Sequence, residues 1–165
     1  MTVALGIDPG SKVTGYGLVT KEGPELKFVA AGFIKADRRA PLPDRLNQIF
    51  CGLQEIIKRH APDEVAVEDI FYAKNVRSAI RLGHMRGVAL LAAAAADLPV
   101  YEYASTAIKM AVVGYGRATK DQVNLMVKHL LKTDQDLSPD ASDALAAAIC
   151  HLNQNPLLSR EKRQR

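Results

Sequence analysis

The sequence contains no tryptophan, four phenylalanines and only two cysteines among its 165 residues. Cys51 and Cys150 lie far apart and lack metal-ligand spacing, so we expect free, reduced thiols in a cytoplasmic protein. The most apolar run, residues 88–96, has nine residues and is too short to cross a membrane. The first residues lead directly into a predicted strand that contains Asp8, so no signal peptide is expected.

Apolar residues make up 48% of the chain, which is enough for the mostly aliphatic core of one compact domain. We therefore predict a single domain over residues 1–155, followed by a basic, disordered tail over residues 156–165. The formal net charge is +4, and residues 159–165 alone hold four basic side chains and one acidic one. The rest of the chain is close to neutral, so any site for a polyanion must be a local patch of Lys and Arg.

Hydrophobic periodicity predicts an α/β fold. The patterns indicate strands over 3–8, 13–20, 26–35, 64–68 and 100–103, and helices over 43–60, 76–97 and 119–132. A last helix is expected to begin at Ser138-Pro139, with Ser as the N-cap, and Thr119 and Gln122 have the spacing of a capping box. This order predicts a mixed sheet, antiparallel in its first half and parallel later, with helices on both faces.

Four acidic residues stand at positions where they could converge. Asp8 and Glu68 end two predicted strands, and parallel neighbouring strands would bring both carboxylates to the same edge of the sheet. Asp140 and Asp143 share one face of a first helical turn. Each has a structural alternative, because an Asp before Pro-Gly can cap a turn and acids in a first turn favour the helix dipole.

As a cluster, these acids point to a metal site. Carboxylates held together without a cation repel one another, and a divalent metal removes that conflict. Ligands that are all oxygen suit Mg²⁺ or Mn²⁺ rather than zinc. Magnesium held by carboxylates is typical of phosphoryl-transfer chemistry, so the residues alone lead to a metal-dependent phosphodiesterase or phosphotransferase.

Several motifs, in order along the chain, resemble the RuvC family of Holliday-junction resolvases. They are Gly6-Ile7-Asp8-Pro9-Gly10-Ser11 with Thr14-Gly15-Tyr16-Gly17, residues 67–75 (VEDIFYAKN), Gly83 with Arg86-Gly87-Val88-Ala89, Glu102-Tyr103-Ala104 with Lys109 and Val112-Val113-Gly114, and residues 140–146 (DASDALA). The resemblance extends from about Leu5 to His151, which is nearly the whole chain.

The resemblance implies a ribonuclease-H-like fold with a five-stranded mixed sheet flanked by helices, acting as a homodimer. It implies an endonuclease of DNA recombination and repair that cuts two strands of like polarity at symmetric points of a four-way DNA junction. Asp8, Glu68, Asp140 and Asp143 match its catalytic, metal-binding acids. They would hold one or two Mg²⁺ per subunit, with Mn²⁺ as a substitute. Association with a branch-migration motor complex is a further expectation from the family.

The resemblance also implies residues that contact DNA. Lys109 and Lys120 match basic positions beside the active site, where one of them could stabilise charge on the scissile phosphate. The aromatic Phe71 would stack on bases at the crossover. Without the resemblance, the sequence is equally consistent with Phe71 being packed in the core. The full predicted DNA-binding set is Phe71, Tyr72, Lys74, Asn75, Arg77, Arg81, Lys109, Arg117 and Lys120, with Arg86 and Lys128 as further candidates for phosphate contacts.

The sequence leaves two rival interpretations open. Residues 8–15 also resemble the phosphate loop of actin-like sugar kinases and chaperone ATPases, but those proteins pair two such domains in a much longer chain. The same fold could also bind junctions without cutting them. Four intact acids argue against that second alternative, because an unused cluster of like charges would cost stability.

Overall fold

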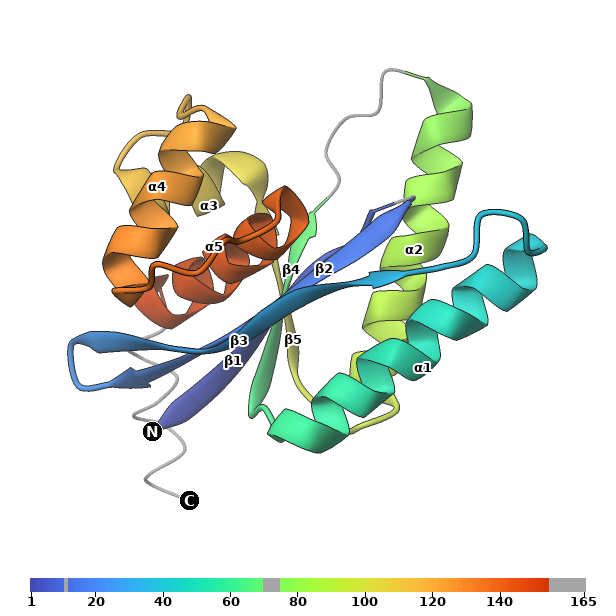
Figure 1. Ribbon diagram of the computed structural model, residues 1–165, viewed down its shortest axis with the longest axis horizontal. Helices are drawn as coiled ribbons and strands as arrows, with labels where there is room; N and C mark the ends of the chain where they lie inside the picture. Colours follow the sequence, from blue (N-terminus) through green and yellow to red (C-terminus); the bar gives the residue numbers. More distant parts are fainter. Residues whose placement is uncertain (11, 70–74, 155–165) are drawn as a thin grey trace.

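The computed structural model describes residues 1–10, 12–69 and 75–154 (Figure 1). The elements are, in order along the chain, β1 (Thr2–Asp8), β2 (Val13–Glu22), β3 (Glu25–Lys35), α1 (Leu42–His60), β4 (Glu64–Asp69), α2 (Val76–Ala94), β5 (Val100–Ala104), α3 (Ser105–Val113), α4 (Lys120–Leu131) and α5 (Pro139–Gln154).

The strands form one five-stranded sheet in the order β3-β2-β1-β4-β5. The first three strands pair antiparallel, and β4 pairs parallel to both β1 and β5. This is the predicted mixed sheet, antiparallel in its first half and parallel in its second. The carboxyl ends of β1, β4 and β5 therefore lie along the same edge of the sheet.

Helices cover both faces of the sheet, and each face has its own core (Figure 1). Alternate residues of β1 point to opposite faces. Leu5 and Ile7 are fully buried in a cluster with Leu53 of α1 and Met85 of α2. Ala4 lies in the second cluster, with residues of α3, α4 and α5. Helices α1 and α2 thus lie on one face and α3, α4 and α5 on the other.

Local signals set where α4 and α5 begin. The side chain of Thr119 accepts a hydrogen bond from the Gln122 backbone, and the Gln122 side chain accepts one from the Thr119 backbone, which confirms the capping box of α4. The Ser138 hydroxyl accepts a hydrogen bond from the backbone of Ala141 at 3.2 Å, as expected of an N-cap. Helix α2 ends at Ala94, three residues before the predicted end.

Helix α3 was absent from the prediction. It starts directly after β5, and its N-cap Ala104 makes no side-chain capping hydrogen bond. The sequence therefore has neither a loop nor a capping residue that would indicate the start of this helix. Ile108 and Val112 anchor it to the second core. Cys51 and Cys150 are free thiols, as predicted. None of the helices among the described residues is long and apolar enough to cross a membrane.

Candidate active site

Asp8 and Glu68 are neighbours at the edge of the sheet. In the parallel pair of β1 and β4, Ile7 lies opposite Val67, so the next residues of the two strands are these two acids. Residues in register on neighbouring strands point to the same face. Gly6, two residues before Asp8, lies directly beneath α5, so both carboxylates belong to the face that α5 covers.

Helix α5 lies unusually close to the sheet because glycines face it. A Cβ on Gly6 would be 1.9 Å from the carbonyl oxygen of Ala144, and a Cβ on Gly15 would be 2.0 Å from that of Asp140. No real Cβ tolerates such contacts. The glycines of β1 and β2 therefore let the first turns of α5, which carry Asp140 and Asp143, approach the strand end that carries Asp8.

The opposite end of α5 is held by a buried polar network. His151 is fully buried, and its Nε2 lies 2.6 Å from a carboxylate oxygen of Glu64 in β4. Its Nδ1 lies 2.7 Å from the Tyr103 hydroxyl of β5. Breaking a buried polar network is costly, so these contacts fix how α5 lies across the sheet. The positions of Asp140 and Asp143 follow from that fixed helix.

The electrostatics of the acids reflect how near they lie to one another. Burial, together with the negative charges of Asp143, Glu68 and Asp140, raises the pKa of Asp8 to about 7. The pKa of Glu68 is also raised, mainly by burial. Residues from three separate segments therefore form one cluster whose ionisation is unfavourable without a nearby cation.

Two predicted lysines lie beside this cluster. The Lys120 ammonium group, at the start of α4, lies 2.7 Å from a carboxylate oxygen of Asp143. The hydrogen bond to Asp143 raises the pKa of Lys120, and the charges of Asp8 and Glu68 raise it as well. Lys109 of α3 is half-buried and lowers the pKa of Glu68 through its charge. Both lysines are therefore within electrostatic reach of the acids.

Ser105 is a site residue that sequence reasoning missed. Its side chain hydrogen-bonds to Glu68, which lowers the pKa of that carboxyl against the larger effect of burial. Ser105 is the first residue of α3, directly after β5, and β5 pairs with the strand of Glu68. The only signal in the sequence is a serine after a short strand, and it gains meaning only once α3 is known.

The donor set of the cluster fits a hard divalent cation, because it offers carboxylate oxygens only. Among the described residues, no three His, Cys, Asp or Glu side chains are arranged so that they could hold a metal ion together. The acids therefore interact by charge at a distance. Asp8, Glu68, Asp140 and Asp143 are the residues that could hold it.

The predicted DNA contacts fall into three groups. Asn75 is the N-cap of α2, where its side chain accepts a hydrogen bond from the Ser78 backbone at 2.8 Å. Arg77 and Arg81 of α2, together with Arg117 before α4, are exposed. The positions of Phe71, Tyr72 and Lys74 lie outside the described residues.

Arg86 is engaged within the chain. It forms ion pairs with Asp69, at 3.2 Å, and with Glu102. Its side chain is only 24% exposed. It therefore ties α2 to the end of β4 and to the middle of β5. Its phosphate contact, considered from the sequence, stays a prediction.

Comparison with known proteins identifies the family. The family described as "Crossover junction endodeoxyribonuclease RuvC" matches residues 4–151. The chain belongs to the RuvC family. A RuvC of Vibrio parahaemolyticus is 51% identical over 158 residues, which cover 96% of this chain and 91% of the relative. A RuvC of Syntrophotalea carbinolica is 56% identical over 147 residues, covering 89% of this chain and 91% of the relative.

Solved structures agree with this assignment. Thermus thermophilus RuvC in complex with a Holliday junction substrate superposes with a TM-score of 0.88 at 32% identity, covering 93% of this chain and 94% of the other. The five-stranded mixed sheet with its helices is thus the ribonuclease-H-like fold of RuvC. The family match favours a nuclease over the rival phosphate-loop and binding-only interpretations.

Proposed function

We propose that this chain resolves four-way DNA junctions by Mg²⁺-dependent hydrolysis of two strands of like polarity at symmetric points. Its membership of the RuvC family makes it a Holliday-junction endonuclease of recombination and repair. The metal, the roles of single residues and the dimer are our proposals. The observation that carries the metal site is the cluster of Asp8, Glu68, Asp140 and Asp143, where burial and mutual repulsion raise the pKa of Asp8 to about 7.

The four acids would hold one or two Mg²⁺ ions, with Mn²⁺ as a substitute. When bound, such ions activate a water and stabilise the leaving oxygen of an in-line displacement at phosphorus. The acids must be ionised to bind a metal, and a neighbouring cation favours that state. Lys120, which contacts Asp143, supplies such a cation.

Lys109 and Lys120 would also act on the phosphate. Charge develops on the non-bridging oxygens as the phosphodiester is attacked, and a fixed ammonium group stabilises it. The Lys120 side chain is 76% exposed, so it can turn from Asp143 towards a bound strand. Ser105 would orient the Glu68 carboxylate through its hydrogen bond and acts as a positioning residue.

The junction itself would be held mainly through its phosphates. Arg77 and Arg81 are exposed in the first turns of α2, which follows the strand of Glu68. Contacts of this kind give affinity that falls steeply with salt. Phe71 and Tyr72 remain predicted base-stacking residues, and Lys74 and Arg117 remain predicted phosphate contacts. Asn75 would contribute by capping α2 and so fixing where its arginines begin.

The proposed homodimer would use the outer face of α2. Val76, Ile80 and Leu91 are 76%, 55% and 59% exposed. Together with Gly83 and Gly87 they recur every three or four residues, so they form one stripe along the helix. A Cβ on either glycine would meet nothing within 4 Å. The sequence alone equally allows these glycines to let α2 lie close to its own sheet, but the open space at both positions argues against that role.

Two active sites related by a two-fold axis match the symmetry of a junction cut in two like strands. An apolar stripe with glycines at its centre suits the close approach of a second copy of α2, because glycine leaves room for another backbone. Association with a branch-migration motor complex stays a prediction drawn from the family.

Cleavage of a synthetic four-way junction and of a linear duplex of the same sequence tests the proposed function. We expect paired cuts in the junction with Mg²⁺, none with EDTA, and little cleavage of the duplex. Replacing Mg²⁺ with Mn²⁺ should keep the activity. Equal cleavage of junction and duplex, or cleavage that persists in EDTA, would contradict the proposal.

A further inference from the structure

Phe33 lies in the same row across the sheet as Asp8. Asp8 pairs with Gly15 across β1 and β2, and Gly15 pairs with Phe33 across β2 and β3. Neighbouring strands are about 4.8 Å apart, so the backbone of Phe33 lies roughly 10 Å from that of Asp8. Residues in one row share a face of the sheet, and the face is the one on which Gly15 meets Asp140 of α5. Phe33 is thus about two strands away from the acids.

The Phe33 ring is open to solvent and accompanied by a cation. Phe33 is 46% exposed, although it lies on the face that α5 covers. The ammonium group of Lys35 lies 5.0 Å from the ring centroid. Lys35 is exposed and forms no ion pair with any of the described residues. An aromatic face next to an unpaired cation is the combination with which proteins bind unpaired nucleotides.

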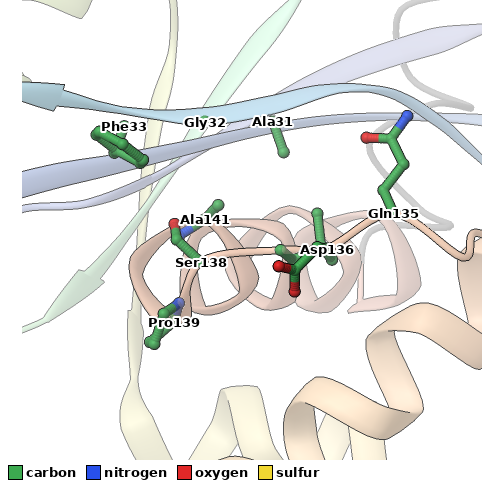
Figure 2. A pocket seen from close by; sticks show the side chains of 9 residues that line it. Ala31, Gly32, Phe33, Gln135, Asp136, Ser138, Pro139 and Ala141 are labelled. Carbon is green, nitrogen blue, oxygen red and sulfur yellow. The ribbon is translucent and has the colours of Figure 1, made fainter.

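A groove opens beside the ring (Figure 2). Ala31, Gly32 and Phe33 of β3 line one wall, and the segment that leads into α5 lines the other, including Gln135, Asp136 and Ser138. The groove holds about 520 Å³. That volume lies within the range of about 300–1,000 Å³ that is typical of small-ligand sites. The amide of Gln135, which points towards β3 (Figure 2), offers hydrogen-bonding atoms of the kind that read base edges.

We propose that this groove binds one unstacked nucleobase of the cleaved strand, with Phe33 stacked on the base and Lys35 near its phosphate. The inference rests on the proposed function, because the row from Asp8 to Phe33 matters only if the scissile phosphate lies at the acids. One nucleotide spans several ångströms of strand, so a base one or two positions from the cut reaches Phe33. Polar atoms at the groove make the site a determinant of which sequence is cut.

Fluorescence of 2-aminopurine tests the stacking directly. In a series of junctions, 2-aminopurine replaces one base at a time among the positions that flank the cut. Binding is measured in EDTA, so that cleavage does not interfere. We expect one position to be quenched by the wild-type protein. Phe33→Ala and Phe33→Leu should both lose that quenching, and Phe33→Tyr should keep it, because only an aromatic face stacks.

Cleavage rates give the second readout. Stacking on an aromatic residue is worth roughly 1–3 kcal/mol, so Phe33→Ala should lower kcat/KM on the preferred junction about 5- to 150-fold. The ratio of kcat/KM between the preferred junction and one altered at the quenched position should fall towards one. Val29→Ala, at another exposed apolar residue of β3, is the matched control and should change neither readout.

The outcomes separate this inference from the proposed function. A wild-type protein that does not cut junctions overturns the proposed function, and the stacking proposal falls with it. Normal wild-type cleavage with unchanged quenching and sequence preference in Phe33→Ala overturns the stacking proposal alone. Wild-type behaviour of Phe33→Leu would also overturn it, because an apolar side chain without a π face would then suffice.

Discussion

The ammonium group of Lys120 lies 2.7 Å from a carboxylate oxygen of Asp143. The lysine begins α4 directly after its N-cap Thr119, and the aspartate lies in the second turn of α5. The Lys120 side chain is 76% exposed, so the pair adds little to the stability of the fold. What matters is its position, because it places a cation against a cluster of half-buried acids.

Lys120→Met should therefore separate catalysis from stability. We expect the cleavage rate at saturating junction to fall roughly 10²-fold, because the charge on the phosphate loses its stabilising partner. The free energy of unfolding should change by less than about 1 kcal/mol. Lys132→Met is the matched control, since Lys132 lies at the other end of α4, is 75% exposed and forms a 2.6 Å pair with Glu25. If the control loses as much activity, the role is not specific to the site.

Asp8→Asn, Glu68→Gln, Asp140→Asn and Asp143→Asn should each abolish cleavage or lower it more than about a hundredfold, because a metal ligand contributes several kcal/mol. Junction binding in a gel shift should remain, since volume and basic contacts are kept. Asp121→Asn, an exposed acid of α4, is the control. Cleavage near the wild-type rate in Asp8→Asn would refute the metal site.

Much of this site follows from the sequence. A carboxylate ending an apolar strand predicted that Asp8 and Glu68 lie at the sheet edge, and the Thr119 and Ser138 caps predicted where α4 and α5 begin. These signals are local. The hydrogen bond between Ser105 and Glu68 and the engagement of Arg86 with Glu102 could not be predicted, because they depend on how α2 and α3 lie against the sheet.

The raised pKa of Asp8 predicts a pH dependence of stability without metal. The unfolded carboxyl loses its proton near 3.8, whereas burial keeps the folded one protonated up to about 7. Between these values the folded state binds more protons, so the free energy of unfolding falls as pH rises and stays low above pH 7. Urea denaturation in EDTA from pH 4 to pH 8 measures this fall.

Asp8→Asn should flatten part of that profile, because Asn does not ionise. At pH 8 in EDTA the variant should be more stable than the wild type by roughly 1–4 kcal/mol. Adding Mg²⁺ should then stabilise the wild type more than the variant. Identical pH profiles for the two proteins would show that Asp8 is not destabilised by its surroundings.

The close packing of α5 predicts the effect of adding a methyl group beneath it. Gly6→Ala should lower the free energy of unfolding by about 3 kcal/mol or more, because its Cβ would be 1.9 Å from the Ala144 carbonyl oxygen, which the helix backbone holds in place. Gly116→Ala is the control, with its nearest atom at 3.5 Å, and should be nearly neutral. Similar melting temperatures for both variants would mean that α5 can lift without cost.

The outer face of α2 predicts the state of assembly. Light scattering should give the mass of a dimer for the wild type and of a monomer for Ile80→Glu and Leu91→Glu, because a charge within an apolar interface is costly. Leu125→Glu is the matched control, since Leu125 is 73% exposed on α4, away from the stripe, and this variant should remain a dimer.

On a supercoiled plasmid with a cruciform, the wild type should give linear product early, because both cuts occur in one binding event. The monomeric variants should accumulate nicked circles instead. A monomeric wild type that yields mainly nicked circles would rule out the paired active sites.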